Sequence, residues 1–247
     1  MFRKELPRTY ELLDLIGNPD SVGSCFHDFD KTLQNPLALA AWRTLENELQ
    51  ELDSAAWKFL REEASAYLAK WDGYRGREQL LNIINQARAY HFLKNKGYTD
   101  IHFIPRCPKT GVRTPDLEGV CGSGKVICEV KTINPSDAET LRRQKGNYLN
   151  DEPLASPFFD KLMSTITDAE KQIEAFDPSK EARHVVYIIP NFDDFWMEYN
   201  RKEEYFRQID HHLSQNVASG IEIVFHNQKT PFHKKVTMNC ATVVNDE

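Results

Sequence analysis

The sequence predicts an α/β fold, in which helices pack on a central mixed sheet and an N-terminal helical extension precedes the sheet. Three observations lead to this prediction. Apolar residues recur at helical spacing between residues 36 and 70, helical and strand patterns alternate after residue 77, and the strand patterns are short apolar runs bounded by Gly and Pro. A chain of 247 residues can bury a large core. We expect the extension to cover residues 1–72 and the sheet domain residues 73–247.

The extension is predicted to be helical from residue 36 onward. Residues 1–35 contain turn-like segments such as Gly17-Asn18-Pro19-Asp20. Beyond them, spacings of three and four place one set of apolar side chains on a single stripe: Trp42, Leu45, Leu49, Leu52, Ala56 and Phe59. Asp53-Ser54 supplies good N-cap residues, which favours two helices here. The stripe can dock within the chain or mediate a homodimer, and packing within the chain is the favoured interpretation.

The sheet domain begins after a junction at residues 71–76. A second amphipathic helix is expected to end at Gly97, which stands where a C-cap glycine belongs. Apolar and β-branched runs then predict strands, and the 3.6-residue period predicts the helices between them. The expected elements are a helix at 77–96, strands at 101–105, 113–120 and 125–131, a helix at 159–176, a strand at 184–189, a helix at 197–215, a strand at 221–225 and one more strand at 234–244.

Charge and cysteine content exclude several classes of protein. The net charge of −6 argues against a protein that grips nucleic acid through its whole surface, so such binding would need a local basic region or metal ions. The five cysteines form no C-x-x-C pair, which argues against a zinc ribbon or a disulfide framework and favours reduced thiols. No apolar run reaches the roughly 18–20 residues of a membrane span, and the charged N-terminus does not resemble a signal peptide. We therefore expect a cytoplasmic protein.

The chemistry-bearing residues are concentrated in one predicted hairpin. Thr114-Pro115-Asp116 opens one strand, and Glu129-Val130-Lys131 ends its neighbour after the turn Gly122-Ser123-Gly124. Because side chains alternate along a strand, Glu129 and Lys131 share a face and Val130 is expected to point into the core. If the two strands pair through the glycine turn, Asp116 converges on the face of Glu129.

Two carboxylates and a lysine are a set that suits hydrolysis of phosphodiesters. Carboxylate oxygens are hard ligands for Mg²⁺ or Mn²⁺. Such an ion activates water and stabilises charge on phosphate, and a lysine adds positive charge beside the reacting phosphorus. The hypothesis requires no cofactor beyond the ion. The alternative is a solvent-exposed hairpin that carries the charges by coincidence.

The hairpin resembles that of the PD-(D/E)xK, or restriction-endonuclease-like, nucleases. Two further motifs add to the resemblance. The segment from Gly73 to Glu78 resembles the G-x-x-x-x-E motif of the RecB-like branch, and the segment from Gln172 to Phe176 resembles its Q-x-x-x-Y motif. Phe176 stands in place of the tyrosine, so a role for a tyrosine hydroxyl is lost. The motifs follow the family's order and cover about residues 73–190.

The resemblance implies a restriction-endonuclease-like sandwich and assigns roles within it. Asp116, Glu129 and Glu78 would be metal ligands, Lys131 the catalytic lysine, and Gln172 a residue that contacts the substrate or the metal site. Outside the resemblance, Glu78 has an equally good interpretation as a first-turn glutamate favoured by the helix dipole. Gln172 is otherwise an ordinary surface residue of a helix.

The expected activity is cleavage of nucleic acid, in the first place DNA, with Mg²⁺ or Mn²⁺. Contacts to DNA are expected at Arg142, Arg143 and Lys145 and around Arg106, Lys109 and Arg113. The rival hypothesis is a nuclease-fold protein without catalysis that binds DNA or serves as an assembly subunit. A purely binding protein has no need to keep both carboxylates and the lysine, which favours the enzyme.

Overall fold

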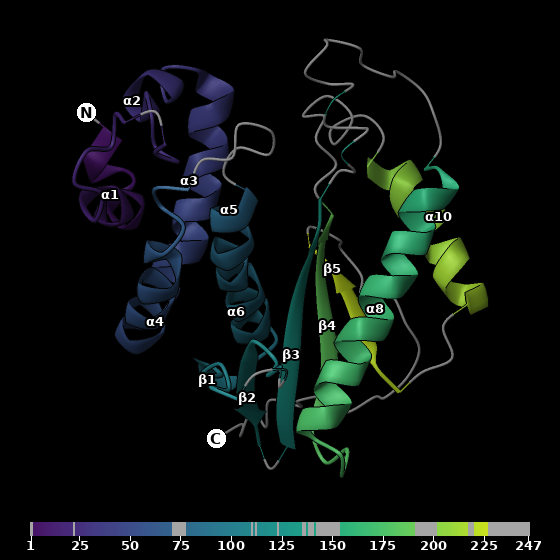
Figure 1. The fold of residues 1–247 in the computed structure, drawn as a ribbon. Helices are drawn as coiled ribbons and strands as arrows, with labels where there is room; N and C mark the ends of the chain where they lie inside the picture. The colour runs from purple at the N-terminus through teal and green to yellow at the C-terminus, as the bar shows by residue number, and fades with distance from the viewer. Residues whose placement is uncertain are drawn as a thin grey trace, which may run out of the picture. The chain divides into compact units, whose positions relative to one another are not determined.

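The computed structural model describes residues 2–21, 23–70, 78–109, 111, 113–122, 124–134, 137, 141, 154–190, 202–216 and 220–226 (Figure 1). The α/β class with a mixed sheet is confirmed. The chain forms two compact units, residues 1–92 and 93–247, so the division falls later than the expected one after residue 72.

The first unit is helical. Its elements are the 3-10 turn η1 (Phe2–Lys4) and the helices α1 (Pro7–Asp14), α2 (Phe29–Thr32), α3 (Pro36–Gln50), α4 (Ser54–Ser65), α5 (Glu78–Ile84) and the start of α6 (Gln86–Asn95). The break before α4 is confirmed, because the Asp53 carboxylate accepts the backbone N–H of Ala56 at 2.8 Å. The helix expected over 77–96 is interrupted at Asn85, a residue type that favours helix ends over helix interiors.

Helix α1 was not expected from the sequence, because its cap comes from a distant residue. Leu6, at the N-cap position, offers no side-chain hydrogen bond. The buried carboxylate of Glu46, in α3, instead accepts the backbone N–H groups of Arg8 at 3.0 Å and Thr9 at 2.9 Å. In return, the Arg8 guanidinium donates to the backbone oxygens of Leu49 and Leu52 at the end of α3.

The apolar stripe predicted in residues 42–59 packs within the chain, as favoured. The Trp42 ring lies 4.9 Å from the ring of Phe29 and 6.0 Å from that of Phe26, centroid to centroid. Polar contacts also join α6 to the preceding helices. Arg88 pairs with Glu48 at 3.1 Å, and the Tyr90 hydroxyl lies 3.3 Å from an Asp53 oxygen. These contacts explain why the first unit extends past residue 72.

The second unit is built on five strands in the order β1-β2-β3-β4-β5 (Figure 1). The strands are β1 (Thr99–Phe103), β2 (Leu117–Cys121), β3 (Gly124–Ile133), β4 (Arg183–Pro190) and β5 (Glu222–Phe225). The first three pair antiparallel and the last three parallel. The helix α8 (Ser156–Phe176) connects β3 to β4, and α10 (Lys202–Asn216) lies between β4 and β5 in the sequence. The strand expected at 234–244 lies outside the described residues.

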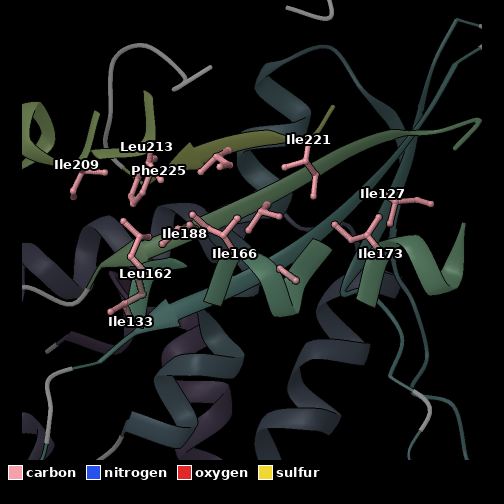
Figure 2. Packing of buried hydrophobic residues seen from close by; sticks show 13 residues of the cluster. Ile127, Ile133, Leu162, Ile166, Ile173, Ile188, Ile209, Leu213, Ile221 and Phe225 are labelled. Atoms are coloured by element: carbon pink, nitrogen blue, oxygen red, sulfur yellow. The ribbon is translucent and has the colours of Figure 1, made fainter. Parts of the chain in front are cut away.

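One face of this sheet packs against α8 and α10. Figure 2 shows Ile127 of β3 beside Ile173 of α8, and Ile188 of β4 near Ile166 of α8. The cluster also contains Leu213 of α10. Because residues two apart on a strand share a face, the odd-numbered residues of β3 from Ile127 to Ile133 face α8. The even-numbered residues lie on the other face.

The structure also bears on the state of the cysteines and on membrane-spanning helices. Cys25, Cys107 and Cys128 carry free thiols, but Cys121 is disulfide-bonded, so the expectation of reduced cysteines throughout is wrong at that position. Within the described ranges, no helix is both long enough and apolar enough to cross a membrane.

Candidate active site

The pairing of β2 with β3 brings Asp116 and Glu129 together. Leu117 lies opposite Cys128, the residue before Glu129, and Asp116 directly precedes Leu117. The backbone N–H of Asp116 donates to the Cys128 oxygen at 3.1 Å, so both Asp116 and Leu117 oppose Cys128 and the ladder is irregular at this point. The carboxyl groups of Asp116 and Glu129 are near enough that each influences the pKa of the other. One Asp116 oxygen also accepts the Val130 backbone N–H at 2.7 Å.

Lys131 lies beside this pair on the same face. Its ammonium donates to an oxygen of Glu129 at 2.5 Å. Glu129 is buried, with 3% of its surface exposed, whereas Asp116 and Lys131 are partly exposed. The pair therefore has an inner member, Glu129, and an outer member, Asp116, with one positive charge at its side.

Gln172 completes the group from the helix that covers this face. Its amide nitrogen donates to the second oxygen of Glu129 at 2.9 Å, and its amide oxygen accepts the Lys131 ammonium at 3.4 Å. The same nitrogen also lies 2.6 Å from the backbone oxygen of Thr114. Gln172 thus holds Glu129, Lys131 and the backbone preceding Asp116 in fixed relation. The sequence did not predict a role for Thr114 in the site, because Thr114 contributes its backbone oxygen, which every residue type has.

Val130 faces away from Glu129 and Lys131 as predicted, but it is less buried than the core position expected for it. It lies on the opposite face from Glu129 and is only partly buried. The residues that flank the acid-x-Lys pair on its own face are Ile127 and Ile133, both members of the α8 cluster (Figure 2). Glu129 therefore lies on the apolar, helix-covered face of the sheet, which accounts for its burial.

Burial changes the proton affinity of both carboxyl groups. Burial is the largest cause that raises the pKa of Glu129 to about 8, and the neighbouring charge of Asp116 raises it further, while Lys131 acts in the opposite direction. Burial also raises the pKa of Asp116, against the Val130 N–H bond and the Lys131 charge. Without a cation, the pair holds a proton at neutral pH.

This protonation predicts how stability depends on pH. An unfolded glutamate titrates near about 4.3. Between that pH and about 8, the folded protein binds a proton that the unfolded chain has lost, so the free energy of unfolding falls as pH rises. Over this range we expect the free energy of unfolding of the wild-type protein to fall on the order of a few kcal/mol more than that of Glu129→Gln, whose side chain does not titrate. Denaturant unfolding in EDTA from pH 5 to 8.5 measures it. Parallel pH profiles for the two proteins would contradict the assignment.

For several other residues singled out in the sequence, a part in this group stays a prediction. Glu78 is the first residue of α5 in the first unit, and its role as a metal ligand stays a prediction. The glycine that opens its motif, Gly73, lies outside the described residues, as does the basic run of Arg142, Arg143 and Lys145. Phe176, the last residue of α8, is 39% exposed.

The paired carboxylates fit a small divalent cation. In the described part of the chain, no three or more His, Cys, Asp or Glu side chains are grouped so as to hold a metal ion. Mg²⁺ is commonly bound through one or two carboxylates and keeps several waters, and it takes its remaining oxygens from substrate phosphate. Asp116 and Glu129 provide those two carboxylates. Each oxygen of Glu129 accepts one hydrogen bond in the structure, and a carboxylate oxygen has a second lone pair.

No protein-family model, curated protein or solved structure matches the chain.

Proposed function

We propose that this protein is a metal-dependent nuclease that hydrolyses phosphodiester bonds, in the first place in DNA, within a domain of the restriction-endonuclease-like type. The observation that supports the proposal best is the group formed by Asp116, Glu129 and Lys131, in which the Asp116 carboxylate accepts the backbone N–H of Val130 at 2.7 Å and the Lys131 ammonium lies 2.5 Å from Glu129. The cofactor is Mg²⁺ or Mn²⁺, and Asp116 and Glu129 are its ligands. Glu78 remains a further candidate ligand.

The arrangement of elements supports the same proposal. The acid-x-Lys strand β3 has an antiparallel neighbour that begins after Asp116 and a parallel neighbour, β4, on its other side. The helix that follows β3 contributes Gln172 to the group. This is the order of motifs on which the resemblance to PD-(D/E)xK nucleases rests, and Gln172 contacts Glu129 and Lys131, two of the residues to which the family pattern gives a role.

Each residue has a defined task in the proposed reaction. When water attacks phosphorus and the bond to the leaving oxygen breaks, negative charge accumulates on the phosphoryl oxygens and on the leaving oxygen. A bound divalent ion supplies activated water and neutralises part of that charge. Lys131 places a fixed positive charge at the same point and orients the attacking water. Gln172 keeps Lys131 and Glu129 in position, and the apolar neighbours of Glu129 strengthen these interactions by excluding water.

The proposal is tested by a nuclease time course on duplex, single-stranded and branched DNA and on RNA, with Mg²⁺, Mn²⁺ or EDTA. Calorimetric titration of the metal accompanies it. We expect cleavage of at least one substrate with either ion and none in EDTA. Wild-type protein that binds metal and DNA but cuts no substrate would contradict the proposal and favour the DNA-binding or assembly subunit.

A further inference from the structure

The loop that connects β1 to β2 concentrates positive charge in a chain that is acidic overall. Residues 105–115, here named the basic loop, contain Arg106, Lys109 and Arg113 and no acidic residue. All three of these side chains are exposed. The whole chain has 31 basic and 37 acidic residues, so the loop is a local exception to the balance of charge.

Hydrogen bonds tie the base of the basic loop to the carboxylate site. The backbone N–H of Ile104 donates to the Asp116 oxygen at 2.9 Å, which closes the loop at its two ends. The Thr114 hydroxyl donates to the Pro105 oxygen at 3.3 Å, and the Thr114 oxygen accepts the Gln172 amide. The three cations are therefore carried by a segment whose ends are fixed at the site. Long connections within a compact domain are commonly functional.

The charge of the loop acts on the site itself. Burial is the main cause of the raised pKa of Asp116, and the positive charge of Arg106 is among the influences that oppose it. Electrostatic influence between exposed groups fades over about 10 Å in ordinary salt. Arg106 is exposed and follows by two residues Ile104, whose N–H is bonded to the backbone oxygen of Asp116, so the loop carries this arginine from a point fixed at the site.

We propose that the basic loop binds the phosphate backbone of a polynucleotide and holds it across Asp116 and Glu129. The inference rests on the proposed function, which identifies the reacting group as a phosphodiester. Arginine pairs with phosphate through two parallel hydrogen bonds, and lysine binds it as a point charge. Three positively charged side chains along one loop suit the successive phosphates of a polynucleotide. The single phosphate of a mononucleotide would contact only some of them. The substrate is therefore a polymer and not a nucleotide.

The test is a binding measurement that does not depend on cleavage. The triple variant Arg106→Gln, Lys109→Gln, Arg113→Gln removes the three charges of the loop. A matched control, Lys125→Gln, Lys161→Gln, Arg207→Gln, removes three charges from exposed positions elsewhere in the second unit. Fluorescence anisotropy gives the Kd for single-stranded DNA, duplex DNA and RNA over a series of KCl concentrations, in EDTA and with Ca²⁺. Circular dichroism verifies that both variants are folded.

We expect the loop variant to bind its preferred polynucleotide roughly 10²-fold more weakly at 0.1 M salt, with a salt slope lower by about two to three, because three counterion-releasing contacts are lost. The control variant should bind as the wild-type protein does. Equal affinity and slope for the loop variant and the wild type, or wild-type protein that binds none of the three probes, would overturn the inference. Loop-dependent binding without any cleavage contradicts the proposed nuclease alone, and cleavage with loop-independent binding contradicts this inference alone.

Discussion

Replacing Glu129 by alanine is expected to abolish binding of Mg²⁺ and to lower DNA cleavage by roughly 10³-fold or more. Glu129 is the buried member of the carboxylate pair, and without it Asp116 is left as a single carboxylate beside Lys131. Loss of the ion removes several kcal/mol of stabilisation of the developing charge, and each 1.4 kcal/mol is about tenfold in rate. Calorimetric titration and single-turnover cleavage, made on the same preparation, measure both effects.

The matched control for this prediction is Glu174→Ala. Glu174 lies on α8 two residues after Gln172, and its side chain is 40% exposed and paired with Lys180. Removing it truncates a glutamate near the site without touching the carboxylate pair, so metal binding and cleavage should be retained. If Glu129→Ala still binds Mg²⁺ with the affinity of the wild-type protein, the metal lies elsewhere.

Replacing Lys131 by alanine is expected to separate catalysis from metal binding. The substitution removes the positive charge next to the reacting phosphate and leaves both carboxylates in place. Cleavage should fall by roughly 10²–10³-fold, the loss typical for one electrostatic stabiliser. Binding of Mg²⁺ should persist, because the two carboxylates proposed as its ligands remain. The fold should survive, since Lys131 is partly exposed near the end of β3.

Lys125→Ala provides the comparison on the same strand. Lys125 is exposed and lies opposite Val120, at the turn end of the β2–β3 hairpin and away from Asp116. It should cut at the wild-type rate. Equal cleavage by Lys131→Ala and Lys125→Ala would mean that the acid-x-Lys motif is coincidental and that any nuclease activity belongs to another part of the chain.

The strand patterns in the sequence were sufficient to place the central group. The alternation of side chains along residues 125–131 predicted that Glu129 and Lys131 share a face. The glycine turn predicted the hairpin that brings Asp116 near Glu129. These relations involve one pair of strands that are neighbours in the sequence, so they can be predicted from the sequence alone. How deeply each face of β3 is buried was harder to predict. Val130 was expected in the core and is only partly buried, although Val126 and Cys128 on the same face of β3 are buried.

Features that depend on distant partners could not be predicted. Helix α1 has no cap in its own sequence, and the carboxylate that caps it, Glu46, comes from α3. The contact of Gln172 with Glu129 joins residues that are 43 positions apart. Its motif marked Gln172 as a candidate, but only the packing of α8 on the sheet brings its amide to Glu129 and to the Thr114 oxygen.

A crystal structure with Mn²⁺ and an oligonucleotide that resists cleavage tests the central claim most directly. Anomalous scattering locates the metal without reference to the protein. We expect one Mn²⁺ in direct contact with an oxygen of Asp116, an oxygen of Glu129 and a non-bridging oxygen of one phosphate, with the Lys131 ammonium close to the same phosphate. A phosphate backbone bound at another surface, or Mn²⁺ absent from between Asp116 and Glu129 while the oligonucleotide is bound, would contradict it.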